Sequence, residues 1–163
     1  MSAGAATLFE SLQADLAGRY TRASTSFGTL VLEIDAADVV PIATRLRDAF
    51  RFTIFLDVTA IDWPQREPRF DVVWHFLCPS AVARVRLKAQ VSVADPTVPS
   101  LTPLYGSAHY MEREAHDMYG IAFAGNDDLR PILLYEGFVG HPLRKDYAKD
   151  HEQPLVPYRE PTP

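Results

Sequence analysis

The stretch FTIFLDVTAIDWPQREPRFDVVWHFLCPSAVARVRLKAQV, residues 52–91, carries the clearest structural pattern in the chain. It holds three apolar runs, Phe52–Asp62, Arg69–Leu77 and Arg84–Val91, separated by short polar connections. In the last run apolar residues alternate with Arg, Arg, Lys and Gln, which is the period of a strand with one buried face. Three consecutive strands with short connections indicate an antiparallel meander, with a basic face on its last strand that meets solvent or a partner.

The residues before the meander predict a helix and a further strand. Leu8, Leu12 and Leu16 recur every four residues and give one apolar stripe, which ends before Gly18. The run Phe27–Ile34 is apolar and β-branched and is predicted to be a buried strand.

A second helix is expected between this strand and the meander, with Asp35 or Asp38 as its cap and Pro41 in its first turn. Its apolar side is expected to consist of Ile42, Leu46 and Phe50.

After the meander, prolines 96, 99 and 103 are predicted to prevent regular structure before residue 104. A third helix is expected from Leu104 to Tyr119, with Gly120 ending it in the left-handed conformation.

These elements predict an α+β fold: one two-layer domain with a mixed or antiparallel sheet and helices on one face, followed by an extended C-terminal arm. The core domain is expected over residues 1–120, including the third helix. Residues 121–163 are expected to form the arm and a Pro-rich tail, because ten of the 44 residues from Gly120 onward are Gly or Pro and show little periodicity.

Composition narrows the class of protein. The formal charge of −5 and a pI near 5.5 disfavour nucleic acid and anionic membrane surfaces as partners. The one cysteine, Cys78, provides neither an internal disulfide nor the four thiolates that an iron–sulfur cluster usually needs. The longest apolar run is interrupted by Asp57 and is about half the ~20 residues of a membrane-spanning helix. Since the N-terminus lacks a basic region, a cytoplasmic location is expected.

Charged residues concentrate between Met111 and Tyr147. On the third helix Glu112, Arg113, Glu114 and Asp117 lie beside an apolar stripe. One interpretation is a solvated helix face and turn; the other is that the acids pair with cations that fix the arm to the domain. The candidate cations are Arg130, Arg144 and Lys145, or those of a partner.

The motifs EREAHDMYGIAF, DLRPILL and GHPLRKDY, in this order, resemble the signature of the 30-kilodalton subunit family of respiratory complex I, whose bacterial members are named its C subunit. DVTAIDWPQREPRFDVVWHFL and VPSLTPLYGSAHYMERE are similar to further stretches of the family, so the resemblance covers about Asp57 to Tyr147. The chain departs from it at Asn126, where the family commonly has histidine, at Pro131, where it often has arginine, and at Tyr110, where it typically has tryptophan.

The resemblance implies a non-catalytic scaffold protein in the peripheral arm of proton-pumping NADH:quinone oxidoreductase, beside the quinone-proximal module. It implies no cofactor in this chain, FMN and iron–sulfur clusters in other subunits, and NADH and quinone as substrates of the assembly. Expected partners are the D subunit, which holds the quinone site, and the cluster-bearing B and I subunits, at the cytoplasmic side of the inner (plasma) membrane. The expected interface and signature residues are Glu112, Arg113, Glu114, Asp117, Gly120, Arg130, His141, Pro142, Arg144, Lys145 and Asp146.

Two alternatives remain open at this point. The first is the equivalent scaffold subunit of a related membrane-bound hydrogenase or dehydrogenase. The second is a small metal-dependent enzyme using His109, Glu112 and His116, which share one side of a helix and offer nitrogen and oxygen ligands. The chain has no GxGxxG or GxxxxGK motif, so no nucleotide-phosphate site is predicted.

Overall fold

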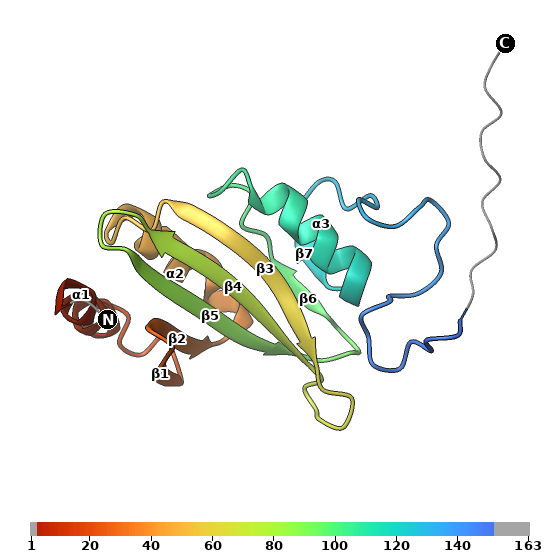
Figure 1. Ribbon diagram of the computed structural model, residues 1–163, viewed down its shortest axis with the longest axis horizontal. Helices are drawn as coiled ribbons and strands as arrows, with labels where there is room; N and C mark the ends of the chain where they lie inside the picture. Colours follow the sequence, from red (N-terminus) through yellow and green to blue (C-terminus); the bar gives the residue numbers. More distant parts are fainter. Residues whose placement is uncertain (1–2, 152–163) are drawn as a thin grey trace, which may run out of the picture.

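The computed structural model describes residues 3–151, with side chains from Ala5 onward, and its main feature is a five-stranded sheet (Figure 1). The strand order is β1-β2-β5-β4-β3; β2 and β5 are parallel, and the other neighbours are antiparallel. The five strands are β1 (Arg22–Ser26), β2 (Thr29–Ile34), β3 (Ile54–Asp62), β4 (Phe70–Cys78) and β5 (Ala83–Val91).

The predicted meander is confirmed as β3, β4 and β5. At its centre Trp74 lies opposite Val58 on β3 and Leu87 on β5, and all three side chains are buried. The alternation in β5 places its apolar residues in the core and its basic residues on the opposite face of the sheet.

The first two strands form a hairpin of which the sequence predicts only half. Strand β1 is not expected from its sequence, RASTS, which is short and polar. Phe27 is predicted inside a buried strand but lies fully exposed in the hairpin turn, where Phe27 and Gly28 both have positive φ, 48° and 76°. The buried strand therefore begins at Thr29, and β2 pairs with β5 rather than extending a simple meander.

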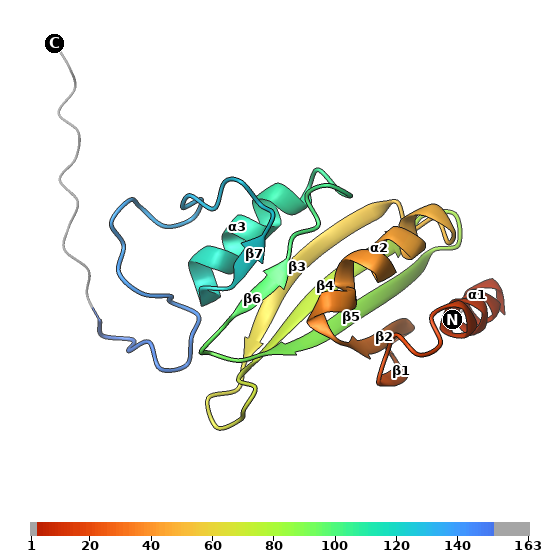
Figure 2. The ribbon, with the colours of Figure 1, turned by 180° about the vertical axis from the view of Figure 1, so that it is seen from behind.

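The helices lie on one face of the sheet. Figure 1 shows β3, β4 and β5 in front of α2, and Figure 2 shows α2 in front of the same strands. Phe50 lies beyond the end of α2 and is only partly buried. The first two helices and the short 3-10 turn between them are α1 (Ala3–Asp15), η1 (Ala36–Asp38) and α2 (Val39–Asp48).

The proline-containing segment after β5 does hold regular structure, contrary to expectation. Strand β6 (Thr97–Pro99) pairs in parallel with β7 (Ala122–Ala124). Proline is tolerated at the end of such a short edge strand, because it has no amide hydrogen to contribute to a ladder. The third helix, α3 (Ala108–Tyr119), therefore starts four residues later than predicted.

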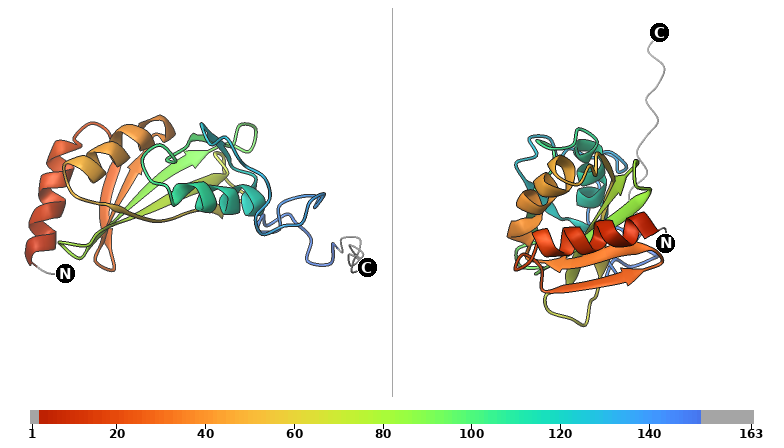
Figure 3. Two further views of the ribbon diagram at one scale, coloured as in Figure 1. Left: turned by 90° about the horizontal axis from the view of Figure 1, so that it is seen from above. Right: turned by 90° about the vertical axis from the view of Figure 1, so that its left-hand side faces the viewer.

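Helix α3 packs beside β3, the edge strand, as Figure 3 shows from two further directions. Tyr105, just before the helix, donates a hydrogen bond to the carbonyl of Phe52 at 2.8 Å and packs against Phe55 and Phe76. Its burial raises the pKa of the Tyr105 phenol to about 12. The predicted α+β class, with a mixed sheet and helices on one face, is confirmed.

The boundary at residue 120 stays a prediction, although β7 pairs with the core strand β6 beyond it. We keep the name arm for residues 125–151, which contain no helix or strand. The Pro-rich tail expected from residue 152 lies outside the described residues. Within the described residues no helix is long and apolar enough to cross a membrane.

Candidate functional site

Helix α3 carries two buried acids. Glu112 is fully buried, and its carboxylate accepts hydrogen bonds from the Ser100 hydroxyl at 2.8 Å, the Leu101 amide at 2.7 Å and the Asn126 side-chain amide at 3.0 Å. Burial, partly offset by these donors, raises the pKa of Glu112. One side chain thus ties the segment before α3 to the segment after it.

Asp117, one and a half turns further along α3, holds the middle of the arm. Its carboxylate accepts hydrogen bonds from three consecutive backbone amides, those of Ile132 at 2.8 Å, Leu133 at 2.9 Å and Leu134 at 3.3 Å. Three amides converging on one oxygen fix the local conformation of a loop that has no ladder of its own.

Arg113, on the same helix, holds the residues just before that loop. Its guanidinium donates to the carbonyls of Arg130 at 2.8 Å and Pro131 at 2.9 Å. The helix therefore binds the arm through both backbone donors and backbone acceptors.

The arm also caps the C-terminus of α3. The last four carbonyls of a helix have no partner within it, and here each accepts a hydrogen bond from Gly120 or from the arm. The pairs are His116 O with Gly120 N at 2.7 Å, Asp117 O with His141 Nδ1 at 3.0 Å, Met118 O with Leu143 N at 3.1 Å and Tyr119 O with Arg144 Nε at 2.7 Å. The cationic Arg144 also complements the negative end of the helix dipole.

Gly120 makes this cap sterically possible. Its φ of 72° is left-handed, as predicted, and a Cβ atom there would lie closer than 3.0 Å to both His141 Nε2 and Arg144 Nη2. The guanidinium of Arg144 also lies over the ring of Phe70, 5.1 Å from its centroid. Burial near Gly120 lowers the pKa of His141.

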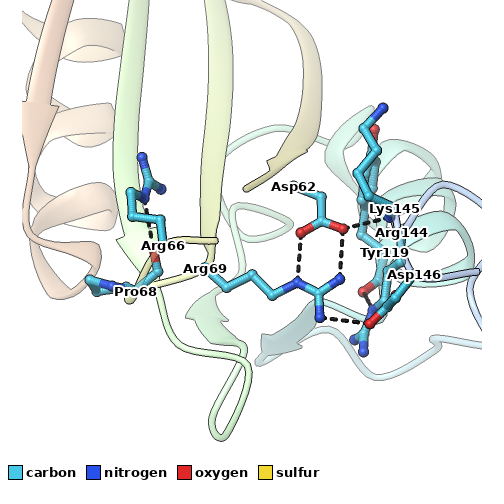
Figure 4. A network of polar contacts seen from close by, with 8 residues as sticks. All are labelled: Asp62, Arg66, Pro68, Arg69, Tyr119, Arg144, Lys145 and Asp146. Carbon is cyan, nitrogen blue, oxygen red and sulfur yellow. Dashed lines mark hydrogen bonds and ion pairs between the residues drawn. The ribbon is translucent and has the colours of Figure 1, made fainter. Parts of the chain in front are cut away.

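A second link joins the arm to the sheet, between β3 and the residues just after the cap (Figure 4). Asp62, at the end of β3, accepts from Arg69 Nε at 2.6 Å and Nη2 at 2.8 Å and from the backbone amide of Lys145 at 2.7 Å. Arg69 also donates to Asp146 at 2.8 Å. The pKa of Asp62 is lowered by the hydrogen bonds from Arg69, and that of Asp146 likewise.

The expected pairing of the helix acids with the arm cations is wrong. Glu112 and Asp117 accept from neutral groups, because both are buried where backbone amides are the nearest donors. Arg130 instead pairs with Asp128 at 2.7 Å, and its side chain is 82% exposed. The acid that does meet a cation of the sheet is Asp62, which sequence reasoning does not select.

The remaining predicted residues divide between contact and exposure. Pro142 is half-buried beside the cap, Glu114 is exposed on α3, and Lys145 contributes its backbone amide while its side chain is exposed. Sequence reasoning misses Asp62, Arg69 and Ser100. The only local signal is the acid and the arginine that bracket the turn WPQREP, because their partner lies 77 residues away.

The arm presents several large apolar side chains to the outside. Within twelve residues five of them are more than a third exposed, a density that is unusual for a solvated loop. They are Ile132 38%, Leu133 60%, Tyr135 37%, Val139 67% and Leu143 48%.

The metal-site alternative is not favoured by the geometry. Glu112 is turned toward Ser100 and Leu101, whereas the His116 ring contacts the Ile121 carbonyl at 2.9 Å. Among residues 3–151 no group of three or more His, Cys, Asp or Glu side chains is arranged to hold a metal ion. Cys78 is buried on β4, next to the Ser80 hydroxyl at 3.3 Å.

Comparison with protein families gives one match. Residues 32–153 match the family model of the respiratory-chain NADH dehydrogenase 30-kilodalton subunit. This range includes the whole sheet except β1 and the first residues of β2, together with α2, α3 and the arm.

Similar proteins in other organisms carry one name, the C subunit of NADH-quinone oxidoreductase. The chain is 49% identical over 144 residues to the protein of this name from Rhodopseudomonas palustris (strain BisB18), covering 87% of this chain and 72% of that protein. It is 50% identical over 127 residues to the one from Agrobacterium fabrum, covering 77% of this chain and 63% of that protein.

Two solved structures share the fold. A trypsin-resistant fragment (1–134) of Nqo5 superimposes with a TM-score of 0.65 at 26% identity, covering 77% of this chain and 99% of the fragment. A chain of the membrane-bound sulfane sulfur reductase, an archaeal respiratory membrane complex, superimposes with a TM-score of 0.69 at 21% identity, covering 88% of this chain and 85% of that one.

Proposed function

Since the chain belongs to the family of the respiratory-chain NADH dehydrogenase 30-kilodalton subunit, we propose that it is a non-catalytic scaffold protein within NADH:quinone oxidoreductase. In this role it sits in the peripheral arm of the complex, supports the quinone-proximal module and holds no cofactor. The NADH, flavin, iron–sulfur and quinone chemistry then belongs to other subunits.

The observation that carries this proposal is an arm fixed in one conformation with its apolar side chains outward. Buried acids and the helix terminus bind its backbone, so the cost of ordering the loop is met inside the chain before any partner arrives. Leu133 and Leu143, whose amides make two of these bonds, have side chains that are 60% and 48% exposed. A rigid loop with exposed apolar anchors has the properties of a protein–protein contact.

The proposed partners are the D subunit, which holds the quinone site, and the cluster-bearing B and I subunits. The proposed location is the cytoplasmic side of the inner membrane, and attachment to the membrane then comes through the complex. The relatives named as part of NADH-quinone oxidoreductase favour this assembly over a related hydrogenase.

The test is a purification of the tagged full chain from its own cells under native conditions, followed by mass spectrometry and an absorption spectrum. We expect iron–sulfur, flavin and quinone-site subunits in the eluate, together with NADH:quinone activity. A colourless protein purified without other subunits would contradict the proposal.

A matched pair of variants tests the arm contact in the same purification. Leu133→Asp places a charge on an exposed apolar residue of the arm, and we expect at least about a tenfold loss of co-purified subunits. Phe27→Asp places the same charge in the exposed β1–β2 turn and should recover them normally. Equal recovery with both variants would refute a role of this loop in assembly.

A further inference from the structure

The face of the sheet opposite the helices carries two adjacent arginines on β5. Arg84 and Arg86 alternate with the buried residues Val85 and Leu87, so both point away from the core. In the sheet register Arg86 lies between Val31 on β2 and His75 on β4. Arg84 lies between Thr29 and Leu77, one residue pair further along the same strands. The two guanidinium groups thus share one region of the sheet surface.

These arginines differ from most of the cations in the chain. Across residues 5–151, no carboxylate oxygen lies within 4.0 Å of either of them, whereas seven other arginines form ion pairs. Arg113 and Arg144 bind backbone carbonyls instead. The Nε atom of Arg86 is moreover buried and has no hydrogen-bond partner. A buried donor of a cation without an acceptor costs free energy, which an incoming acceptor would recover.

The acids nearest in the register are already engaged. Asp71 on β4 binds Lys88, Arg66 and the Trp63 indole, and Glu33 on β2 pairs with Arg22. Asp57 lies opposite His75 on the far side from Arg86, and no ion pair joins it to either arginine. Burial and then the charges of Arg86 and Arg84 lower the pKa of His75, which is consistent with an uncompensated positive field.

We propose that Arg84 and Arg86 form a docking site for a carboxylate-bearing segment of a neighbouring protein subunit, an inference that rests on the proposed function as a scaffold. Guanidinium groups bind Asp and Glu carboxylates through paired N–H donors. Half-buried Val31 and Leu77 beside them add apolar contact that suits a polypeptide. Two arginines in a chain of formal charge −5 form no extended basic surface, so nucleic acid and anionic lipid are disfavoured.

Carbodiimide cross-linking of the intact assembly tests the proposal, because this reagent joins only an amine and a carboxylate in direct contact. The double substitution R84K/R86K keeps both charges and supplies the amines. We expect a cross-link from position 84 or 86 to an Asp or Glu of another subunit. Lys88 and Asp71, 2.8 Å apart, provide an internal positive control. The control cross-link alone, or a new cross-link only within this chain, would overturn the proposal.

Charge reversal gives an independent readout in the native purification. R84E/R86E should lower the co-purified subunits at least about tenfold while the unfolding midpoint of the isolated chain stays unchanged. The control R19E/R22E makes the same change in net charge at two arginines whose side chains are 50% and 70% exposed, and it should recover the subunits normally.

The outcomes separate this inference from the proposed function. If the unmodified chain recovers no other subunits, the scaffold function fails and this inference fails with it. If the unmodified chain and R84E/R86E recover them equally, only the docking site is refuted. Should R84E/R86E fail to fold, the cross-linking of R84K/R86K decides.

Discussion

Gly120 is the residue on which the helix cap depends. Ala at this position adds a Cβ atom closer than 3.0 Å to His141 and Arg144 and also strains a backbone with φ of 72°. We expect Gly120→Ala to lower the free energy of unfolding by about 3 kcal/mol, as measured by urea denaturation.

Two other glycines separate the causes of that loss. Gly18 has φ of 86° with nothing within 4 Å of an added Cβ, so Gly18→Ala reports backbone strain alone, about 1 kcal/mol. Gly106 has open space and no positive φ, and its substitution should be nearly neutral. A cost at Gly120 no larger than that at Gly18 would show that the cap is not sterically constrained.

Glu112 makes a prediction about pH. Because burial raises its pKa in the folded protein, the native state binds more protons than the unfolded chain between the ordinary pKa and the raised value. Its contribution to the unfolding free energy therefore falls as pH rises through that window. Glu112→Gln removes this titration and leaves an amide NH₂ facing a donor, at a cost of about 1 kcal/mol that should shrink toward neutral pH.

Urea denaturation of both proteins at a series of pH values, from mildly acidic to neutral, checks this expectation. The difference between their unfolding free energies should decrease with pH. A constant difference would mean that Glu112 titrates normally despite its burial.

At the scale of elements, the ion pair between Asp62 and Arg69 joins β3 to the arm. Arg69→Met leaves a buried carboxylate with only the Lys145 amide as a donor, and we expect a loss of about 3 kcal/mol in urea denaturation. Asp146→Asn removes the outer acid, whose side chain is 58% exposed, and should cost at most about 1 kcal/mol. Similar losses for both variants would contradict the central role of Asp62.

The elements differ in how far sequence predicts them. The alternation in β5 and the apolar stripe of α2 are readable because each buries one face at a fixed period. Strands β1, β6 and β7 are short, and their residues become strands only because a neighbouring strand is available to pair with them. No local period marks such a strand.

At the scale of the whole molecule, the arm is bound to the domain mainly by polar contacts. Leu129 is its one described residue packed against the hydrophobic core. We therefore expect the amides of Leu133, Leu143 and Lys145 to exchange through a local opening, with a smaller free energy than the amide of Val72 on β4. Native-state hydrogen exchange measures both; equal values would show that arm and sheet unfold as one unit.

The sequence by itself determined the fold class, the central meander, the left-handed Gly120 and the family, because periodicity and motifs are local properties of the chain. Only the tertiary structure decided what the signature residues do. Glu112 and Asp117 lie on the helix arc expected to be charged and solvated, yet both are buried. Their donors, and the partners of Asp62, come from segments distant in sequence. The physical reason is that a buried polar group must find its partner in space, and the folded chain alone fixes which groups meet.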